Sequence, residues 1–273
     1  MKDFEVKLHT NPEIKPVIQA QRRIPFLIRK KVEIELDRLE KDDIIEKVEG
    51  ATQWVSPLVI TPKKNSDEIR ICVDMRLPNT SILRTRHPMP TTDELISDLN
   101  GACHFSKLDL KQGYHQLTLA EESRNLTTFT THKGLRRYKR LCFGVNSAAE
   151  IFQNTISQTI QDISNAKNMC DYVIIWGKTL EAHNTALAKV LQRFEEKGIT
   201  LNEGKCRFNK TRLQFYGLVF SKEGVSPDPS LVQDFANTQP PKNVSEVRSL
   251  LGMSQYCANS FKIMQQSQSP CEG

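Results

Sequence analysis

The sequence places one carboxylate, Asp171, just ahead of a short apolar run, residues 173–176, which Gly177 closes. The run is rich in β-branched and aromatic residues, as is typical of a β-strand. Asp171 is then expected at the mouth of that strand, in a tight turn from a preceding short strand. A carboxylate there can bind a divalent cation if a second one stands beside it, but aspartate is also common in ordinary turns. On this stretch alone, the ordinary turn is the favoured interpretation.

A second predicted strand, residues 104–109, also runs into an aspartate, Asp109. Magnesium prefers carboxylate and phosphate oxygens, so two aspartates on neighbouring strands are the expected protein ligands of a magnesium site. Asp109 and Asp171 therefore form a candidate metal-binding pair. Tyr114 follows closely enough for its ring to stand beside the first carboxylate. The plain alternative for Tyr114 is a tyrosine of the core.

Together the two stretches resemble the catalytic core of reverse transcriptases from gypsy-like LTR retrotransposons. The family pattern around its first aspartate is like F-S-x-L-D-L-x-x-G-Y-x-Q, and residues 105–116 match it. The second aspartate of the family lies in an x-x-D-D turn before an apolar strand that ends in F/W-G. This chain matches that pattern except at the last carboxylate, where Tyr172 stands. The resemblance implies that Asp109 and Asp171 are catalytic and bind metal, and that Tyr172 is a degenerate position.

The implied reaction is template-directed DNA synthesis from RNA or DNA, with primer–template and dNTP as substrates. Two Mg²⁺ ions about 3.5–4 Å apart activate the primer hydroxyl and neutralise the leaving pyrophosphate. A phenol with a pKa near 10 is neutral at pH 7, so Tyr172 cannot replace a carboxylate as a ligand of a hard cation. The sequence therefore predicts an impaired polymerase. The alternatives are a non-catalytic nucleic-acid-binding module and a structural module, such as an inactive subunit that supports an active one.

Residues 56–73 predict a β-hairpin with a polar turn, and strict alternation turns Arg70 away from the apolar face. In the resembled family this hairpin belongs to the fingers, and its basic residues hold the triphosphate of the incoming nucleotide. The resemblance thus implies nucleotide-binding roles for Arg70 and Lys64, with Lys63 as an alternative to Lys64. A solvated basic hairpin is the plain explanation. The family also places an aromatic residue, here Tyr114, beneath the nucleotide sugar.

Further segments match the family. Residues 141–153 resemble L-P-F-G-L-x-x-A-P-x-x-F-Q, with Cys142 in place of the first proline, which implies that Phe143 and Gly144 lie near the nucleotide. Residues 213–220 predict a strand that resembles the element gripping the primer end, which implies nucleic-acid contacts from Tyr216 and Gly217. The densest basic segment can hold phosphates, although a solvated loop is the usual explanation for such a run. Its candidate nucleic-acid-binding residues are Lys133, Arg136, Arg137, Lys139 and Arg140.

The resemblance implies an α+β fold of the right-hand polymerase type, with an antiparallel palm sheet packed on helices and a smaller fingers subdomain. Residues 1–92 are expected to form an N-terminal lead-in and fingers. Residues 93–220 are expected to form the palm, with a basic fingers insertion near 120–145. Residues 221–273 would contain the start of a thumb or connection region and an unpatterned tail. Without protease, ribonuclease H or integrase segments, the chain is expected to be a piece of a larger polyprotein.

Three amphipathic helices are predicted from the spacing of apolar residues. The first follows Pro25 and repeats apolar residues at intervals of four, four and three between 28 and 39. The second begins at a capping box formed by Ser147 and Glu150. The third begins at a cap, Thr179. Its expected inward-facing residues are Leu187, Leu191 and Phe194.

Composition limits the remaining function classes. Hydrophobic residues make up 38% and charged residues 26%, which is ordinary for a globular protein, and no apolar run reaches membrane-spanning length. The first residues lack the apolar region of a signal peptide, and the seven cysteines include no C-x-x-C pair. We therefore expect an intracellular protein, cytoplasmic or nuclear, that is not secreted and has no membrane partner. The net charge of +6 permits a polyanionic partner, and the oligomeric state stays open.

Overall fold

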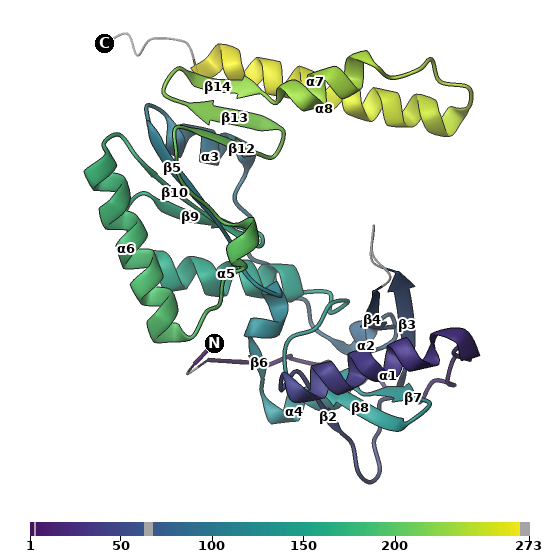
Figure 1. The fold of residues 1–273 in the computed structure, drawn as a ribbon. Helices are drawn as coiled ribbons and strands as arrows, with labels where there is room; N and C mark the ends of the chain where they lie inside the picture. Colours follow the sequence, from purple (N-terminus) through teal and green to yellow (C-terminus); the bar gives the residue numbers. More distant parts are fainter. Residues whose placement is uncertain (3, 63–67, 268–273) are drawn as a thin grey trace. The chain divides into compact units, whose positions relative to one another are not determined.

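The structure is a computed structural model that describes the chain except for residues 3, 63–67 and 268–273, with only the backbone described at 231, 235 and 256–267 (Figure 1). The chain forms two compact units, each built from several separate segments. The first unit contains Met1–Pro88, Leu110–Gln158 and Phe194–Thr200. The second contains Met89–Asp109, Thr159–Arg193 and Leu201–Gly273.

The first unit contains a five-stranded sheet in the order β2-β8-β7-β3-β4. Strand β3 pairs in parallel with β7, and the other neighbours are antiparallel. The β3–β4 pair is the predicted hairpin, with Leu58 opposite Val73 at the end away from the turn. The prediction of a hairpin is therefore confirmed. The strands are β2 (Ile45–Lys47), β3 (Ser56–Pro62), β4 (Ile69–Val73), β7 (Phe129–Thr131) and β8 (Gly134–Tyr138).

Helix α1 (Phe26–Lys41) begins directly after Pro25 and contacts strands β2 and β4. Val32, Leu36 and Leu39 are buried, as their spacing predicts, because residues four and three apart lie on one helical face. The charged residues of α1 occupy the other positions and remain available for the ion pairs described below. The first of the three helix predictions is thus confirmed.

Shorter elements complete the first unit, and β1 pairs in parallel with β6. Helix α5 starts where the sequence predicts, and Phe152 and Ile156 are buried on its inner face. The carboxylate of Glu150 accepts hydrogen bonds from the guanidinium of Arg84, and the capping box with Ser147 stays a prediction. The elements are β1 (Glu5–Val6), α2 (Pro78–Ser81), η1 (Gly113–Gln116), β6 (Thr118–Leu119), α4 (Glu121–Arg124), η2 (Asn125–Thr127) and α5 (Ala148–Ile160).

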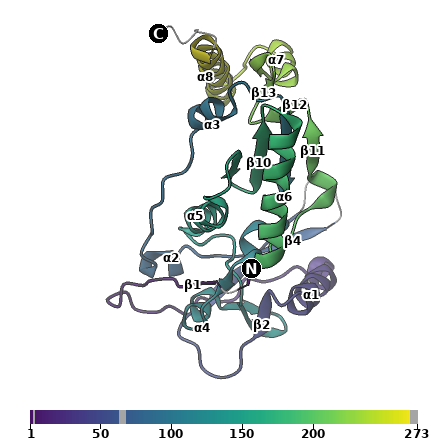
Figure 2. The same ribbon diagram turned by 90° about the vertical axis from the view of Figure 1, so that its left-hand side faces the viewer.

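The second unit contains a four-stranded antiparallel sheet in the order β11-β5-β10-β9. Helix α3 (Thr92–Leu99) packs with one face of this sheet, where its buried leucines meet Phe105 and Ile174. Helix α6 (Leu180–Lys197) lies along the sheet in the views of Figures 1 and 2. The strands are β5 (His104–Asp109), β9 (Ala166–Met169), β10 (Tyr172–Gly177) and β11 (Arg207–Lys210), and η3 (Glu203–Lys205) precedes β11.

A buried polar network joins α6 to two strands of this sheet. The imidazole of His183 is completely buried, and its Nε2 lies 2.9 Å from the hydroxyl of Ser106 on β5. The same hydroxyl accepts a hydrogen bond of 3.0 Å from the backbone N–H of Asn209 on β11. Because buried polar groups cost free energy unless they are paired, this network fixes the three elements together.

Helices α6 and α3 each begin at a threonine cap. The hydroxyl of Thr179 accepts a hydrogen bond from the N–H of Ala182, which confirms the predicted cap. Thr91 and Glu94 form a capping box at the start of α3. The inward face of α6 was predicted wrongly at Leu191, which is exposed. Phe194 is buried as predicted and Leu187 is half-buried, and the other buried residues of the helix are His183, Ala186 and Val190.

The predicted continuous strand over residues 213–220 is wrong, because the chain turns back on itself there. Strands β12 (Arg212–Phe215) and β13 (Leu218–Ser221) are joined by a two-residue turn, and β14 (Gly224–Pro227) completes a three-stranded sheet. Tyr216 and Gly217 in the turn both have positive φ, 47° and 67°, as tight hairpin turns require. Helices α7 (Pro229–Ala236) and α8 (Val244–Ser267) follow. None of the helices in the described part of the chain is long and apolar enough to cross a membrane.

Candidate active site

The hairpin β9–β10 holds Asp171 in its turn. Tyr172 pairs with Met169, so Cys170 and Asp171 alone form the connecting loop. Cys170 has a φ of 53°, in the left-handed region that side chains other than glycine seldom adopt. The predicted tight turn ahead of the apolar strand is confirmed.

Strands β5 and β10 are adjacent and place Asp109 directly opposite Tyr172. Directly opposed residues on neighbouring antiparallel strands point to the same face of the sheet. The carboxylate of Asp109 is largely buried, and the hydroxyl of Tyr172 donates a hydrogen bond to it. The position that the family fills with a carboxylate is therefore occupied by a group that already binds the first aspartate.

Asp171 is exposed at the turn, and the negative charge of Asp109 affects the pKa of its carboxyl group. Partial burial, followed by repulsion from Asp109, raises the pKa of Asp171, and Lys205 opposes this shift. An aspartate raises the pKa of another only when the two negative charges are close. The structure thus brings the two predicted catalytic aspartates to one end of the sheet.

The ligands available at this site can be compared with those that a divalent cation prefers. Two carboxylates supply hard oxygen ligands of the kind that magnesium prefers. Within the described residues, no cluster of three or more His, Cys, Asp or Glu side chains could hold a metal ion. The phenol of Tyr172 is neutral and donates to Asp109. Asp109 and Asp171 therefore offer two carboxylates, one fewer than the set of three that the resemblance implies, and the binding of a cation between them stays a prediction.

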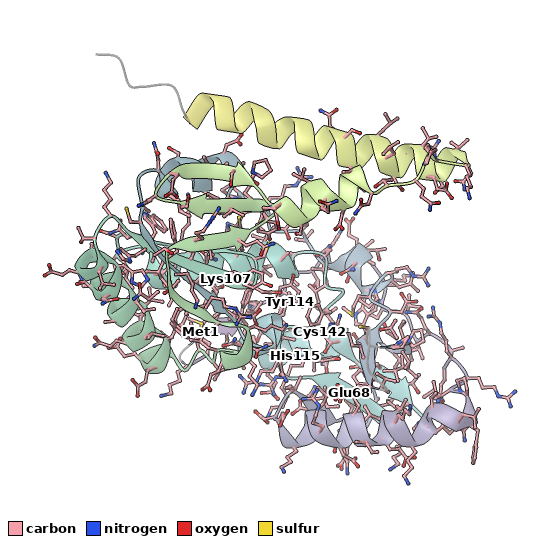
Figure 3. The ribbon with its side chains drawn as sticks, turned by 45° about the horizontal axis from the view of Figure 1, so that its top comes forward. Met1, Glu68, Lys107, Tyr114, His115 and Cys142 are labelled. Atoms are coloured by element: carbon pink, nitrogen blue, oxygen red, sulfur yellow. The ribbon has the colours of Figure 1, made fainter. Side chains whose placement is uncertain are left out.

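Tyr172 is integrated into an aromatic cluster of the second unit. Its ring meets that of Phe215 edge-on, with centroids 5.6 Å apart, and the ammonium of Lys107 lies 5.1 Å from the centroid of the Tyr172 ring. Lys107 stands on β5 two residues before Asp109 (Figure 3). Burial, then the charges of Asp109 and Asp171, raise the pKa of the Tyr172 hydroxyl, so that it remains a neutral hydrogen-bond donor.

The two residues predicted to grip the primer end form the β12–β13 turn. Tyr216 is partly exposed, and its ring packs edge-on against that of Phe215 at 4.4 Å. Burial, then a hydrogen bond with the thiol of Cys170, raise the pKa of Tyr216. The turn with Tyr216 and Gly217 is therefore linked to the turn that carries Asp171. Contact with nucleic acid stays a prediction.

The predicted nucleotide-binding residues lie in the first unit. The rings of Tyr114 and Phe143 pack with centroids 4.8 Å apart. Gly144 has a φ of 99°, and a Cβ there would lie 3.2 Å from the side chain of Met75, so the turn needs a glycine. Arg70 is exposed on β4, as its alternation predicts. Lys63 and Lys64 lie outside the described residues, and the binding of nucleotide stays a prediction.

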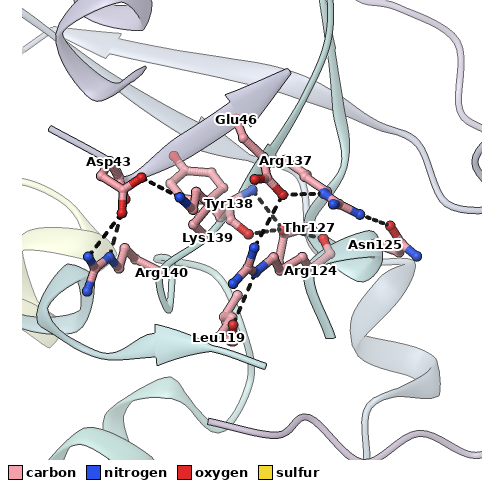
Figure 4. A network of polar contacts seen from close by, with 10 residues as sticks. All are labelled: Asp43, Glu46, Leu119, Arg124, Asn125, Thr127, Arg137, Tyr138, Lys139 and Arg140. Atoms are coloured by element: carbon pink, nitrogen blue, oxygen red, sulfur yellow. Dashed lines mark hydrogen bonds and ion pairs between the residues drawn. The ribbon is translucent and has the colours of Figure 1, made fainter. Parts of the chain in front are cut away.

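The densest basic segment is paired with carboxylates of the same unit (Figure 4). Arg136, which is largely buried, forms an ion pair with Glu40 of α1. Arg137 binds Glu46 at 2.7 Å. The other pairs are Lys133 with Glu33, and Lys139 and Arg140 with Asp43. The five cations thus have structural partners, which were not foreseen, and their role in nucleic-acid binding stays a prediction.

Comparison with known proteins identifies the family. Residues 61–220 match the sequence profile of the family described as reverse transcriptase (RNA-dependent DNA polymerase). The chain belongs to this reverse transcriptase family. The retrovirus-related Pol polyprotein from transposon gypsy of Drosophila melanogaster is 31% identical over 231 residues, which are 81% of this chain and 22% of that protein. The corresponding polyprotein from transposon 412 of the same species is 30% identical over 90% of this chain and 20% of its own length.

Solved structures show the same fold. A foamy viral protease-reverse transcriptase solved in complex with double-stranded DNA is 18% identical, with a TM-score of 0.83 over 97% of this chain and 47% of that one. Another, solved with an RNA/DNA hybrid, is 19% identical, with a TM-score of 0.80 over 92% of this chain and 34% of that one. The predicted α+β polymerase fold is confirmed. The reverse transcriptase domain spans about a fifth of the length of the two transposon polyproteins.

Two basic residues of this reverse transcriptase domain were not among the predicted site residues, and of these Lys107 was missed in the sequence. Lys107 lies on the face of Asp109, and the period of two along a strand could have revealed this. Arg76 donates bonds of 2.8 and 2.7 Å to the carboxylate of Asp74, which also binds Arg22 at 2.5 Å. Arg76 matches the family pattern, and in the structure it braces the end of the β3–β4 hairpin.

Proposed function

We propose that this chain is a retrotransposon-derived reverse transcriptase domain that binds primer–template and nucleotide, and in which two-metal DNA synthesis is impaired by Tyr172. The observation that carries the proposal is the cross-strand pairing of Tyr172 with Asp109, which sets a phenol beside the first aspartate where a second carboxylate is expected. An ionised carboxylate has a limited set of lone pairs, and this donor uses one that a cation would need. The fold is retained, while the ligand set for metal is reduced.

Asp109 and Asp171 would hold a divalent cation in this site, since both offer oxygen and lie at one end of the β5–β10 pair. When bound, such an ion would neutralise phosphate charge and activate the primer hydroxyl. Tyr172 acts against this arrangement by orienting Asp109 toward its own hydroxyl. Its ring is held by Phe215 and Lys107, so it cannot move aside without losing those contacts.

The substrates are proposed from the family and from the residues that match it. Arg70 and Lys64 would bind the triphosphate, and Tyr114 would lie beneath the sugar and obstruct a 2′-hydroxyl. Phe143 and Gly144 would contact the nucleotide nearby. Primer–template is the expected nucleic acid, because the similar foamy viral proteins were solved with double-stranded DNA and with an RNA/DNA hybrid. Mg²⁺ is the expected cation.

Primer extension tests the proposal. We expect the chain to bind a labelled primer–template, with an affinity that falls as salt rises, and to extend it poorly or not at all. Tyr172→Asp should raise Mg²⁺-dependent extension, and Asp109→Asn in that background should abolish it. Robust extension by the unaltered chain, lost on Asp109→Asn, would show that Tyr172 is tolerated and would overturn the proposed impairment.

A second candidate is a nucleic-acid-binding module without catalysis. The packing of Tyr172 favours it, because the ring is built into the cluster with Phe215 as a core residue. Under this candidate, Tyr172→Asp leaves extension at zero while binding to primer–template is unchanged. To exclude a limit set by segments beyond residue 273, both versions of residue 172 would also be tested in a chain extended with the thumb of a related reverse transcriptase.

A further inference from the structure

Strand β11 forms an edge of the four-stranded sheet in the second unit, where β5 is its neighbour. All four of its residues, Arg207–Lys210, are exposed. Phe208 is 45% exposed, which is unusual for a large aromatic ring in a sheet. An exposed edge with an exposed aromatic ring and several cations suggests a surface that binds a ligand.

A register shift in β11 turns two cations to one face. Arg207 lies opposite Lys107, and Lys210 lies opposite Phe105, with an irregularity between them. In a regular strand, residues three apart point to opposite faces, and a bulge of one residue brings them to the same face. Lys107 and Phe105 share the face of Asp109, so Arg207 and Lys210 are directed to that face as well.

Carboxylates in the described part of the chain do not compensate the charges of Arg207 and Lys210. The guanidinium of Arg207 donates to the carbonyl oxygens of Gly204 at 3.1 Å and Cys206 at 2.9 Å, which are neutral. Neither Arg207 nor Lys210 forms an ion pair with a described residue. Arg212 follows at the start of β12 and is exposed, and a hydrogen bond with Ser221, with a smaller contribution from Arg212, lowers the pKa of Glu223. The segment differs in this respect from residues 133–140, where each cation has an acidic partner.

We propose that Arg207, Phe208, Lys210 and Arg212, here called the β11 edge, bind the phosphate backbone of a single-stranded nucleic acid and stack one of its bases. Three residues of strand span about 10 Å, a length that reaches more than one phosphate of an extended strand. Phosphates select uncompensated cations, and an exposed aromatic ring stacks on an unpaired base of any sequence. This inference rests on the proposed function and names where the second unit would hold the strand.

A simpler explanation exists for the same residues. Charged side chains on an edge strand prevent it from pairing with the edge of another molecule. That explanation predicts that removing the charges promotes association between copies of the chain and leaves nucleic-acid affinity unchanged. The binding proposal predicts the opposite pattern, so one set of variants distinguishes the two.

The test is fluorescence anisotropy with a labelled oligo(dT) of 20 nucleotides, at several salt concentrations. Arg207→Gln with Lys210→Gln should weaken binding and lower the slope of log K against log salt by about 1.4, since each lost contact to a single strand removes about 0.7. The matched control is Lys178→Gln with Lys189→Gln, which removes the same charge from exposed positions of the second unit and should leave the slope unchanged.

A further variant isolates the stacking interaction. Phe208→Leu keeps an apolar side chain and should weaken binding to oligo(dT) roughly five- to hundredfold, with an unchanged salt slope. A blunt duplex has no unpaired base, so its affinity should not respond to this substitution. Circular dichroism would show that each variant folds. If the double variant fails to fold, Lys210→Gln alone should still lower the slope by about 0.7.

The outcomes separate the inference from the proposed function. If the unaltered chain binds no nucleic acid, both are overturned. If it binds with a steep salt dependence that the β11-edge variants do not change, the inference alone is overturned. If light scattering shows that copies of the double variant associate while their affinity for oligo(dT) is unchanged, the charges of the edge serve to prevent pairing between sheet edges. If the variants lose affinity for polyglutamate but not for oligo(dT), the inference is overturned, and an acidic protein is the ligand of this edge.

Discussion

Replacing Tyr172 by phenylalanine should tighten the binding of a divalent cation by this domain. The substitution removes only the hydroxyl that donates to Asp109, and it leaves the ring against Phe215 and Lys107. A hydrogen bond to a charged group contributes about 1.5–3 kcal/mol, and the lower value applies here because Tyr172 is only half-buried. A cation no longer has to break this bond, so its affinity should rise by about tenfold.

The assay is titration of the protein with Mn²⁺ by calorimetry, without nucleic acid or nucleotide. Tyr172→Phe should bind about tenfold more tightly than the unaltered chain, and Tyr172→Asp more tightly still, because it adds a third carboxylate. Asp109→Asn in the phenylalanine variant should remove the gain. If the phenylalanine variant binds Mn²⁺ no better than the unaltered chain, the hydrogen bond to Asp109 is not what limits metal binding.

Tyr172→Asp should also lower the stability of the domain, and this effect can be measured separately from metal binding. It removes the contact with Phe215, worth about 0.5–1.5 kcal/mol, and the contact with Lys107, worth about 0.5–1 kcal/mol. The free energy of unfolding should therefore fall by about 1–2.5 kcal/mol in the absence of metal. Added Mn²⁺ should restore part of this loss, because a ligand that binds the folded state stabilises it.

Three further outcomes are expected. In a variant made active by a restored carboxylate, Tyr114→Ala should admit ribonucleotides more readily, and unchanged discrimination in competition assays would reduce Tyr114 to a packing residue. Arg76 lowers the pKa of Asp74 to about 2. The ionised Asp74 therefore contributes fully to the free energy of unfolding above its usual pKa near 3.9, and this contribution is lost as pH falls toward 2. Arg76→Gln should make the free energy of unfolding depend less on pH in this acid range. Arg136→Gln should lower the free energy of unfolding by about 1–3 kcal/mol, because it leaves Glu40 without its partner. Chemical denaturation measures this loss, and an unchanged midpoint would contradict it.

Much of the palm and hairpin structure could be predicted because apolar residues repeat with a clear period. The strand after Asp171 and the face of α1 from Val32 to Leu39 follow from such patterns. The turn at Tyr216 was missed because apolar residues continue on both sides of it, so that two short strands look like one. Leu191 was assigned to the core because leucine is usually a core residue. The structure instead buries His183, whose imidazole is hydrogen-bonded to Ser106.

The site could be predicted as a set of residues but less well as a set of contacts. The motifs named Asp109, Asp171 and Tyr172, and the structure places Asp109 opposite Tyr172 in neighbouring strands, with Asp171 in the turn just before Tyr172. The hydrogen bond from Tyr172 to Asp109 depends on cross-strand register, which a sequence does not state. Partners far apart in the chain were also unforeseen: Arg136 and Glu40 are 96 residues apart. The bulge in β11 lies in a polar stretch with no period that would indicate it.

The network of Ser106, His183 and Asn209 lies on the face of β5 opposite Asp109, since successive residues of a strand alternate between faces. Changes at sites without shared partners usually have additive effects on stability. The residues that hold this sheet together are therefore separate from those that would perform the reaction. A genomic copy can lose its polymerase chemistry by drift and still produce a folded protein, which remains available for selection on another property.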